Sequence, residues 1–152
     1  MANETISRAL TDIINLNRTS VKGYQEAAEE VKSADLKAKL GEYSQQRAGF
    51  VSDLEGFASQ YGIEAKEEST IESVATDAAA AVHRGCINIK AAITGKSDSA
   101  VLDAAETGEA TALKAYETVL ATDIPAGAKS VFQQQHDAIL QAKNWLSMNK
   151  SK

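Results

Sequence analysis

The sequence predicts an all-α protein built as a bundle of long helices, and three observations point to this class. Apolar residues recur every three or four positions over stretches of more than twenty residues, which is the period of a helix. Nine glycines and one proline are too few for the many tight turns of a β-sandwich or barrel. Finally, 43% hydrophobic and 24% charged residues are typical of a globular chain. We therefore predict a single domain that spans residues 1–152.

The first two helices are expected over residues 4–32 and about 36–61. In the first, the apolar stripe is marked by Ile6, Leu10, Ile13 and Val31. In the second, it runs from Leu36 to Tyr61, and Gly62 follows as a C-cap.

A third helix is expected over residues 69–94, followed by Gly95. Its start carries Ser69 and Glu72, the two side chains of a capping box, which satisfy free backbone amides at a helix N-terminus. A fourth helix, over about 99–121, would be capped by Ser97 or Asp98.

A fifth helix is expected from Pro125 to about Asn149, because proline is tolerated in the first turn of a helix. The linkers at 33–34, 95–97 and 122–124 are short, so each joins antiparallel neighbours. The first, second, fourth and fifth helices then form a four-helix bundle. The helix over 69–94 is the additional helix that makes the long crossover.

Several polar residues fall on or beside the core-facing stripes when each helix is projected at 100° per residue. Glu109 lies near the centre of its stripe, whereas Glu106 lies closer to the rim and His136 at the flank. Four other polar residues project into the core at similar depths: Asn17, Tyr24, Arg47 and Gln135. A buried carboxylate costs several kcal/mol unless it is paired or bound to a metal. Glu109 therefore needs a partner.

Two partners for Glu109 are compatible with this pattern. The first is Arg47, in an ion pair helped by Asn17, Tyr24 and Gln135. The second is a metal ion, held by Glu106, Glu109 and His136. We favour the ion pair, because a complete di-metal site needs several inward carboxylates and the sequence offers one that is well centred.

Six short motifs stand out along the chain: residues 23–29 (GYQEAAE), 82–85 (VHRG), 90–95 (KAAITG), 106–109 (ETGE), 115–117 (AYE) and 124–126 (IPA). As a set, these motifs resemble a family of bacterial ferritin-like four-helix-bundle proteins of unknown function. The resemblance covers nearly the whole chain and implies the ferritin-like fold, but it brings no established activity.

Ferritin-like di-iron proteins place a Glu on each of two helices and Glu-x-x-His on each of the other two. By this resemblance, Glu109 matches the lone Glu of the third bundle helix. Residues 133–136 match the last Glu-x-x-His, with Gln133 in place of the Glu and His136 in place. The second bundle helix has no His, and the first has no Glu on its core stripe. These departures argue against an oxidising di-iron centre and leave a single-metal or vestigial site as the alternative.

Composition excludes several other functions. A net charge of −5 and a pI near 5.1 argue against binding to nucleic acid or to an anionic membrane. The single cysteine, Cys86, excludes an intramolecular disulfide, and we interpret it as a small core residue and His83 as a surface or helix-interface residue. No apolar run is long enough for a membrane span and no secretion signal is recognisable, so we expect a cytoplasmic protein.

We therefore expect a non-enzymatic bacterial ferritin-like bundle with a polar or ion-paired core in place of a di-iron centre. We expect no cofactor, a homodimer, and a stress-related role, with another ferritin-like protein as a second kind of partner. The alternative is a metal-binding protein that holds iron or manganese in a degenerate ferritin-like site.

Overall fold

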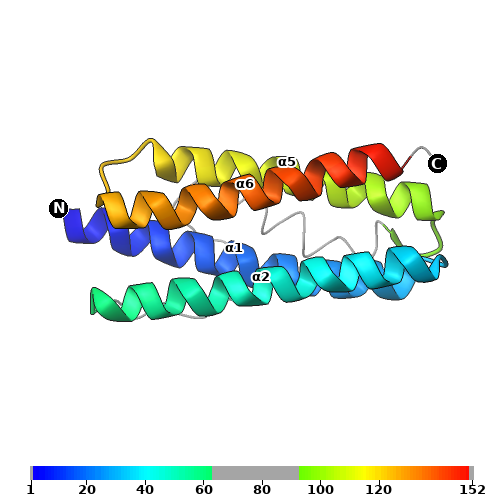
Figure 1. Ribbon diagram of the computed structural model, residues 1–152, viewed down its shortest axis with the longest axis horizontal. Helices are drawn as coiled ribbons and strands as arrows, with labels where there is room; N and C mark the ends of the chain where they lie inside the picture. Colours follow the sequence, from blue (N-terminus) through cyan, green and yellow to red (C-terminus); the bar gives the residue numbers. More distant parts are fainter. Residues whose placement is uncertain (1, 63–92, 151–152) are drawn as a thin grey trace.

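A computed structural model describes residues 2–62 and 93–150, which form four long α-helices (Figure 1). These are α1 (Ala2–Glu30), α2 (Ala34–Gln60), α5 (Asp98–Leu120) and α6 (Ala126–Asn149). The helices run side by side along the long axis of the molecule. Within the described residues there is no strand. The predicted all-α bundle is confirmed.

The additional helix predicted over residues 69–94 falls almost entirely outside the described residues. The same holds for its capping box at Ser69 and Glu72, and for His83 and Cys86.

Local chemistry explains where the helices begin and end. The Ser33 hydroxyl accepts a hydrogen bond from the Leu36 amide (3.3 Å) and caps α2. The Ser97 hydroxyl does the same for α5 through the Ala100 amide (3.2 Å). Gly95, which precedes α5, has a φ of +74°, in the left-handed region that favours glycine.

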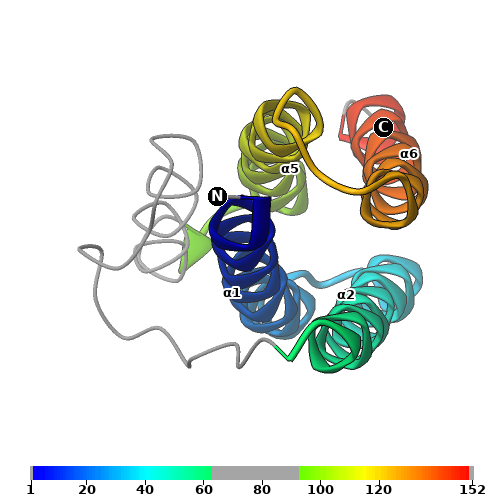
Figure 2. The same ribbon diagram turned by 90° about the vertical axis from the view of Figure 1, so that its left-hand side faces the viewer.

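The four helices form two antiparallel hairpins, α1 with α2 and α5 with α6, as Figure 2 shows from one end of the bundle. The hairpins meet mainly where α1 packs against α5, whereas α2 and α6 have the fewest contacts of the four neighbouring pairs. The face between α2 and α6 is thus the most loosely packed of the four.

The apolar core consists of two clusters along the bundle. The first is built from residues such as Leu10, Ile13, Leu54, Tyr116 and Phe132. The second is built from residues such as Tyr24, Leu40, Tyr43, Leu102 and Leu146. Each of the four helices also buries at least one polar residue near its middle, among them Asn17, Arg47, Glu109 and Gln135. We call these four residues, together with Tyr24 and Tyr116, the polar layer.

Hydrogen bonds fasten the two hairpins together at one end of the bundle. The Asp98 carboxylate accepts from the Lys32 amide (2.8 Å) and the Ser33 amide (3.1 Å), which lie in the turn between α1 and α2. The Glu30 carboxylate accepts from the Gly95 amide (2.7 Å). The start of α5 is therefore held against the turn of the other hairpin.

None of the helices in the described part of the chain combines the length and the apolar character needed to cross a membrane.

Candidate functional site

At the centre of the polar layer, Arg47 of α2 pairs with Glu109 of α5. Arg47 Nη1 lies 2.8 Å from Glu109 Oε1, and Arg47 Nη2 lies 2.5 Å from Glu109 Oε2. The two side chains are 0% and 4% exposed. The guanidinium thus makes a bidentate contact with the carboxylate, a geometry that satisfies both oxygens at once.

The surroundings of the pair keep the guanidinium charged. Burial lowers the pKa of Arg47, but the charge and hydrogen bonds of Glu109, followed by Tyr24 and Tyr116, together raise it more, so the net pKa is above the ordinary value. Arg47 Nε also donates to Gln46 Oε1 (3.1 Å), and its Cζ lies 5.4 Å from the centre of the Tyr24 ring. Burial, followed by the charge of Glu109, raises the pKa of Tyr24, which keeps its hydroxyl neutral.

A second set of contacts joins three helices through uncharged groups. Asn17 Nδ2 on α1 donates to the Ile13 carbonyl (2.9 Å) and to Tyr116 Oη (2.7 Å) on α5. The Tyr116 hydroxyl donates to Gln135 Oε1 (2.8 Å) on α6. All three side chains are buried, and burial raises the pKa of Tyr116. The polar layer therefore links all four helices.

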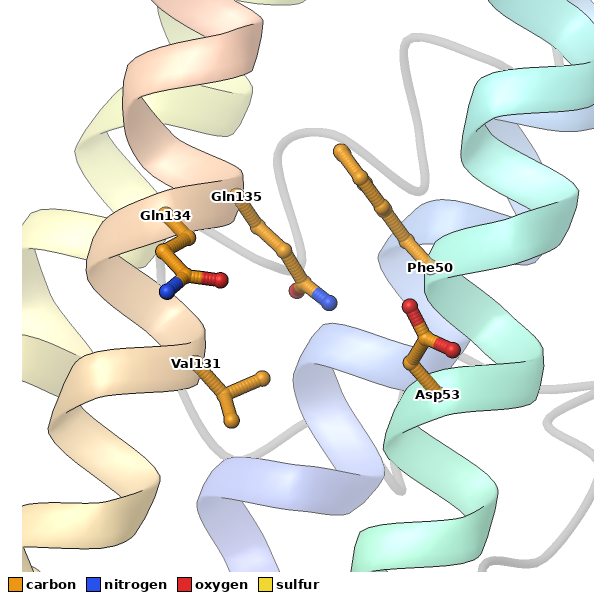
Figure 3. A pocket seen from close by; sticks show the side chains of 5 residues that line it. All are labelled: Phe50, Asp53, Val131, Gln134 and Gln135. Carbon is orange, nitrogen blue, oxygen red and sulfur yellow. The ribbon is translucent and has the colours of Figure 1, made fainter.

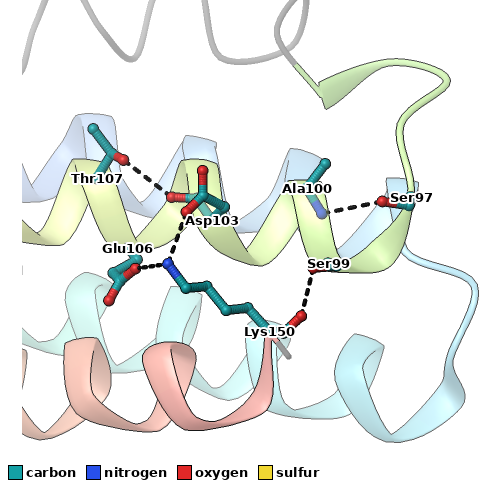
Figure 4. A network of polar contacts seen from close by, with 7 residues as sticks. All are labelled: Ser97, Ser99, Ala100, Asp103, Glu106, Thr107 and Lys150. Carbon is teal, nitrogen blue, oxygen red and sulfur yellow. Dashed lines mark hydrogen bonds and ion pairs between the residues drawn. The ribbon is translucent and has the colours of Figure 1, made fainter. Parts of the chain in front are cut away.

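The structure places Glu106, Glu109 and His136 in three separate contacts. Glu109 is engaged by Arg47. Glu106 accepts from Lys150 Nζ (2.5 Å), which reaches it from the end of α6 (Figure 4). Within residues 2–62 and 93–150, no group of three His, Cys, Asp or Glu side chains is placed to hold a metal ion.

Angular position explains why these three side chains lie apart. Glu106 sits three residues before Glu109, about 60° around the helix, and therefore faces the rim. There Lys150, through its hydrogen bond, lowers the pKa of Glu106. His136 follows Gln135 and is turned about 100° away from it, so Nε2 lies 3.1 Å from Glu117 Oε2 on the neighbouring helix.

A cavity of 390 Å³ opens between α2 and α6, beside the polar layer (Figure 3). It is lined by Phe50 and Asp53 from α2, and by Val131, Gln134 and Gln135 from α6. Gln135 belongs to both the polar layer and the cavity, so the cavity reaches from the surface to the polar centre of the bundle.

Two parts of this arrangement do not follow from sequence reasoning. The helical period places Tyr116 on the apolar stripe, and nothing in the spacing indicates that its hydroxyl joins Asn17 to Gln135. Asp53 and Gln134 are exposed residues on their helices. Only the loose packing of α2 against α6 makes them cavity residues, and that packing has no sequence signature.

The fold and the polar layer define a four-helix-bundle protein with a buried ion pair at its centre. Its family is shown by sequence comparison: residues 5–122 match the model of a domain of unknown function (DUF2383). This match covers well over half of the 152 residues, so the chain belongs to the DUF2383 family. The chain matches no curated protein and no solved structure.

Proposed function

We propose that this protein is a non-enzymatic, single-domain bundle of bacterial origin, related to ferritin-like proteins, in which an ion pair replaces the metal centre. The observation that carries this proposal is the bidentate contact between Arg47 and Glu109 at the centre of the bundle. In ferritin-like di-iron proteins, inward carboxylates occupy such positions and bind metal.

The chemistry of the pair supports this proposal. The guanidinium uses both oxygens of Glu109, which is the carboxylate that matches a metal ligand by resemblance. Arg47 also places a fixed positive charge at the centre, and its pKa is raised by the carboxylate. A divalent cation approaching Glu109 therefore meets a carboxylate whose negative charge Arg47 already balances and whose two oxygens are both engaged.

Elemental analysis of purified, untagged protein tests the proposal. The protein is incubated with ferrous iron, manganese or zinc, desalted, and its metal content measured. We expect the wild type to carry metal only at background, on the order of a tenth of an equivalent or less. The Arg18→Met variant, which removes a surface arginine paired with Glu55, controls for the loss of a positive charge and should give the same metal content.

The opposite outcome defines the alternative function. One or two equivalents of iron or manganese in the wild type, lost in a Glu109→Ala variant, would overturn the proposal and establish a metal-binding protein. The thermal melt of Glu109→Ala, recorded in the presence and absence of chelator, separates loss of metal from loss of fold.

We further propose that the protein acts in the cytoplasm through its surface, as a homodimer or together with another ferritin-like protein under stress. Leu140, 40% exposed on α6, supports an apolar contact there. Light scattering should report a dimer that Leu140→Glu weakens and that the neighbouring exposed-site control Gln141→Glu does not. A concentration-independent monomer contradicts the dimer, and pull-downs from stressed cells test the second partner.

A further inference from the structure

The cavity between α2 and α6 has the size of a small ligand site. Its 390 Å³ lies at the lower end of the range of about 300–1,000 Å³ found for small-molecule pockets. A molecule with one ring therefore suits it better than a nucleotide or a lipid. The chemistry of the lining decides which one-ring molecule fits.

The floor of the cavity presents a hydrogen-bond donor, the Gln135 NH₂ group. Contacts among α1, α5 and α6 determine the orientation of this group. The Ile13 carbonyl can only accept, so Asn17 must turn its NH₂ group toward it and toward Tyr116 Oη. The Tyr116 hydroxyl accepts from Asn17 and so gives its own proton to Gln135 Oε1. The Gln135 NH₂ group then faces the other way, into the cavity (Figure 3).

The Gln135 NH₂ group is therefore available to donate a hydrogen bond to a molecule in the cavity. Its side chain belongs to a residue only 4% exposed. Its Nε2 makes no hydrogen bond to any residue that the structure describes, although its Oε1 is engaged. The Nε2 atom opens onto the cavity, so a ligand there can accept its hydrogen bond in place of solvent.

The opposite wall offers a hydrogen-bond acceptor and two apolar surfaces. The Asp53 carboxylate projects from α2 toward the cavity, across from Gln135 (Figure 3). Phe50 and Val131, both half-buried, supply the apolar contacts. A ligand that fits both walls carries an acceptor for Gln135, a donor for Asp53, and a flat apolar group between Phe50 and Val131.

Charge and hydrogen-bonding pattern together decide between ligands of similar shape. Asp53 disfavours an anion, and the positive charge of Arg47 behind Phe50 does not help one, because Glu109 already neutralises it. A cation such as an amidinium has donors only, which leaves the Gln135 NH₂ group without an acceptor. An uncharged carboxamide has one acceptor and one donor on neighbouring atoms.

We propose that the cavity between α2 and α6 binds a small uncharged carboxamide attached to a compact apolar ring. Gln135 donates to its carbonyl oxygen, Asp53 accepts from its NH₂ group, and Phe50 and Val131 pack against the ring. This site is separate from the question of metal, because no residue of the inferred metal set lines the cavity.

Three probes of nearly equal shape test the proposal: benzamide, benzoate and benzamidine. Each is titrated into ¹⁵N-labelled wild-type protein, up to about 20 mM because ligands of this size bind weakly. The Gln135 side-chain amide signal, assigned by its loss in Gln135→Met, is the readout. We expect benzamide to shift this signal saturably. The two charged probes should bind at least roughly fivefold more weakly than benzamide.

Variants of the lining residues test whether the probe binds in the cavity. Asp53→Ala, at an exposed helical position, should weaken benzamide binding roughly fivefold, and Val131→Trp should abolish it by filling the space. Gln133→Met, on the exposed side of α6, is the matched control for Gln135→Met and should bind as wild type does. If Gln135→Met does not fold, Asp53→Ala and Val131→Trp still decide.

Three results would overturn the proposal. One is the absence of any shift with benzamide at the highest concentration. Another is equal binding of all three probes, which indicates a nonspecific apolar contact. The third is benzamide binding that survives both Asp53→Ala and Val131→Trp, which places the probe elsewhere.

Discussion

Arg47 and Glu109 are buried so completely that each depends on the other. Removing one leaves the other as an uncompensated charge in a medium of low polarity, which costs about 3–5 kcal/mol. We expect Arg47→Met and Glu109→Leu each to lower the free energy of unfolding by this amount, and the double variant to recover much of the loss. Urea unfolding followed by circular dichroism measures all three variants.

A surface pair provides the comparison for this cycle. Arg18 and Glu55 lie 3.5 Å apart with side chains 28% and 50% exposed, so their coupling should be about 0–1 kcal/mol. If the losses from Arg47→Met and Glu109→Leu simply add in the double variant, the two charges do not stabilise each other.

His136 makes stability depend on pH in a direction that its contacts determine. Burial lowers its pKa, but Glu117 and Asp137 raise it more, so its folded pKa lies above the ordinary value of about 6.5. The protonated form therefore contributes stability that is fully present below about pH 6.5 and is lost as the pH rises through the folded pKa.

We expect His136→Gln to lower the melting temperature at about pH 5.5 and to have little effect at about pH 8.5. At the lower pH, Asp137 stays ionised because His136 and Gln133 lower its pKa. A melting-temperature difference that is the same at both values of pH would show that the charge of His136 is not involved.

The residues of the polar layer could be predicted from sequence, whereas most of their partners could not. Asn17, Arg47, Glu109 and Gln135 are identified by a period of 100° per residue, because burial near the middle of a long helix depends mainly on angular position. Which partner a buried or rim residue contacts depends on how far neighbouring helices are shifted along their axes and on which helix ends lie side by side. Lys150 reaches Glu106 only because the end of α6 lies beside the start of α5, and a single-helix projection does not contain that information.

At the scale of a helix, the boundaries follow from short-range chemistry and were therefore predictable. The expected stretch 99–121 corresponds to α5, at Asp98–Leu120, and the structure selects Ser97 over Asp98 as its cap. Asp98 instead binds the turn between α1 and α2, a contact 65 or 66 residues away in sequence. Such contacts between distant segments are what local patterns do not predict.

Two glycines in different backbone conformations should respond to alanine in opposite directions. Gly95 has a φ of +74°, where an L-residue with a side chain is strained by about 1–2 kcal/mol, so Gly95→Ala should destabilise. Gly49 lies within α2, and no side chain or neighbouring helix comes within 4 Å of the position that an alanine methyl group would take. Gly49→Ala should therefore stabilise by about 0.5–1 kcal/mol. Thermal melts measure both; shifts of the same sign would contradict this account.

At the scale of the whole molecule, the short linkers predicted the antiparallel order of neighbours, and the two hairpins confirm it for α1 with α2 and α5 with α6. The loose packing between α2 and α6 was not predictable, because it results from the sum of many side-chain volumes across two hairpins. The cavity, and with it the proposed ligand site, belongs to this level.

We expect the bundle to unfold in one cooperative step, because the polar layer and both apolar clusters include residues from all four helices. Trp145 is the only tryptophan, and its ring centre lies 5.9 Å from that of Tyr43 on α2, so its fluorescence reports the contact between α2 and α6. The fluorescence and far-ultraviolet circular dichroism midpoints in urea should coincide. An earlier fluorescence midpoint would mean that α6 separates from α2 before the helices melt.

The hydrogen bonds from Asn17 through Tyr116 to Gln135 have a consequence for how the helices are aligned along their axes. Apolar stripes repeat nearly every turn, so a helix displaced by one turn, about 5.4 Å, still finds apolar neighbours. The same displacement of α6 would bring Phe132 or Ile139 opposite the Tyr116 hydroxyl, and neither accepts a hydrogen bond. The polar layer therefore favours the native axial position of α6 over positions displaced by one helical turn.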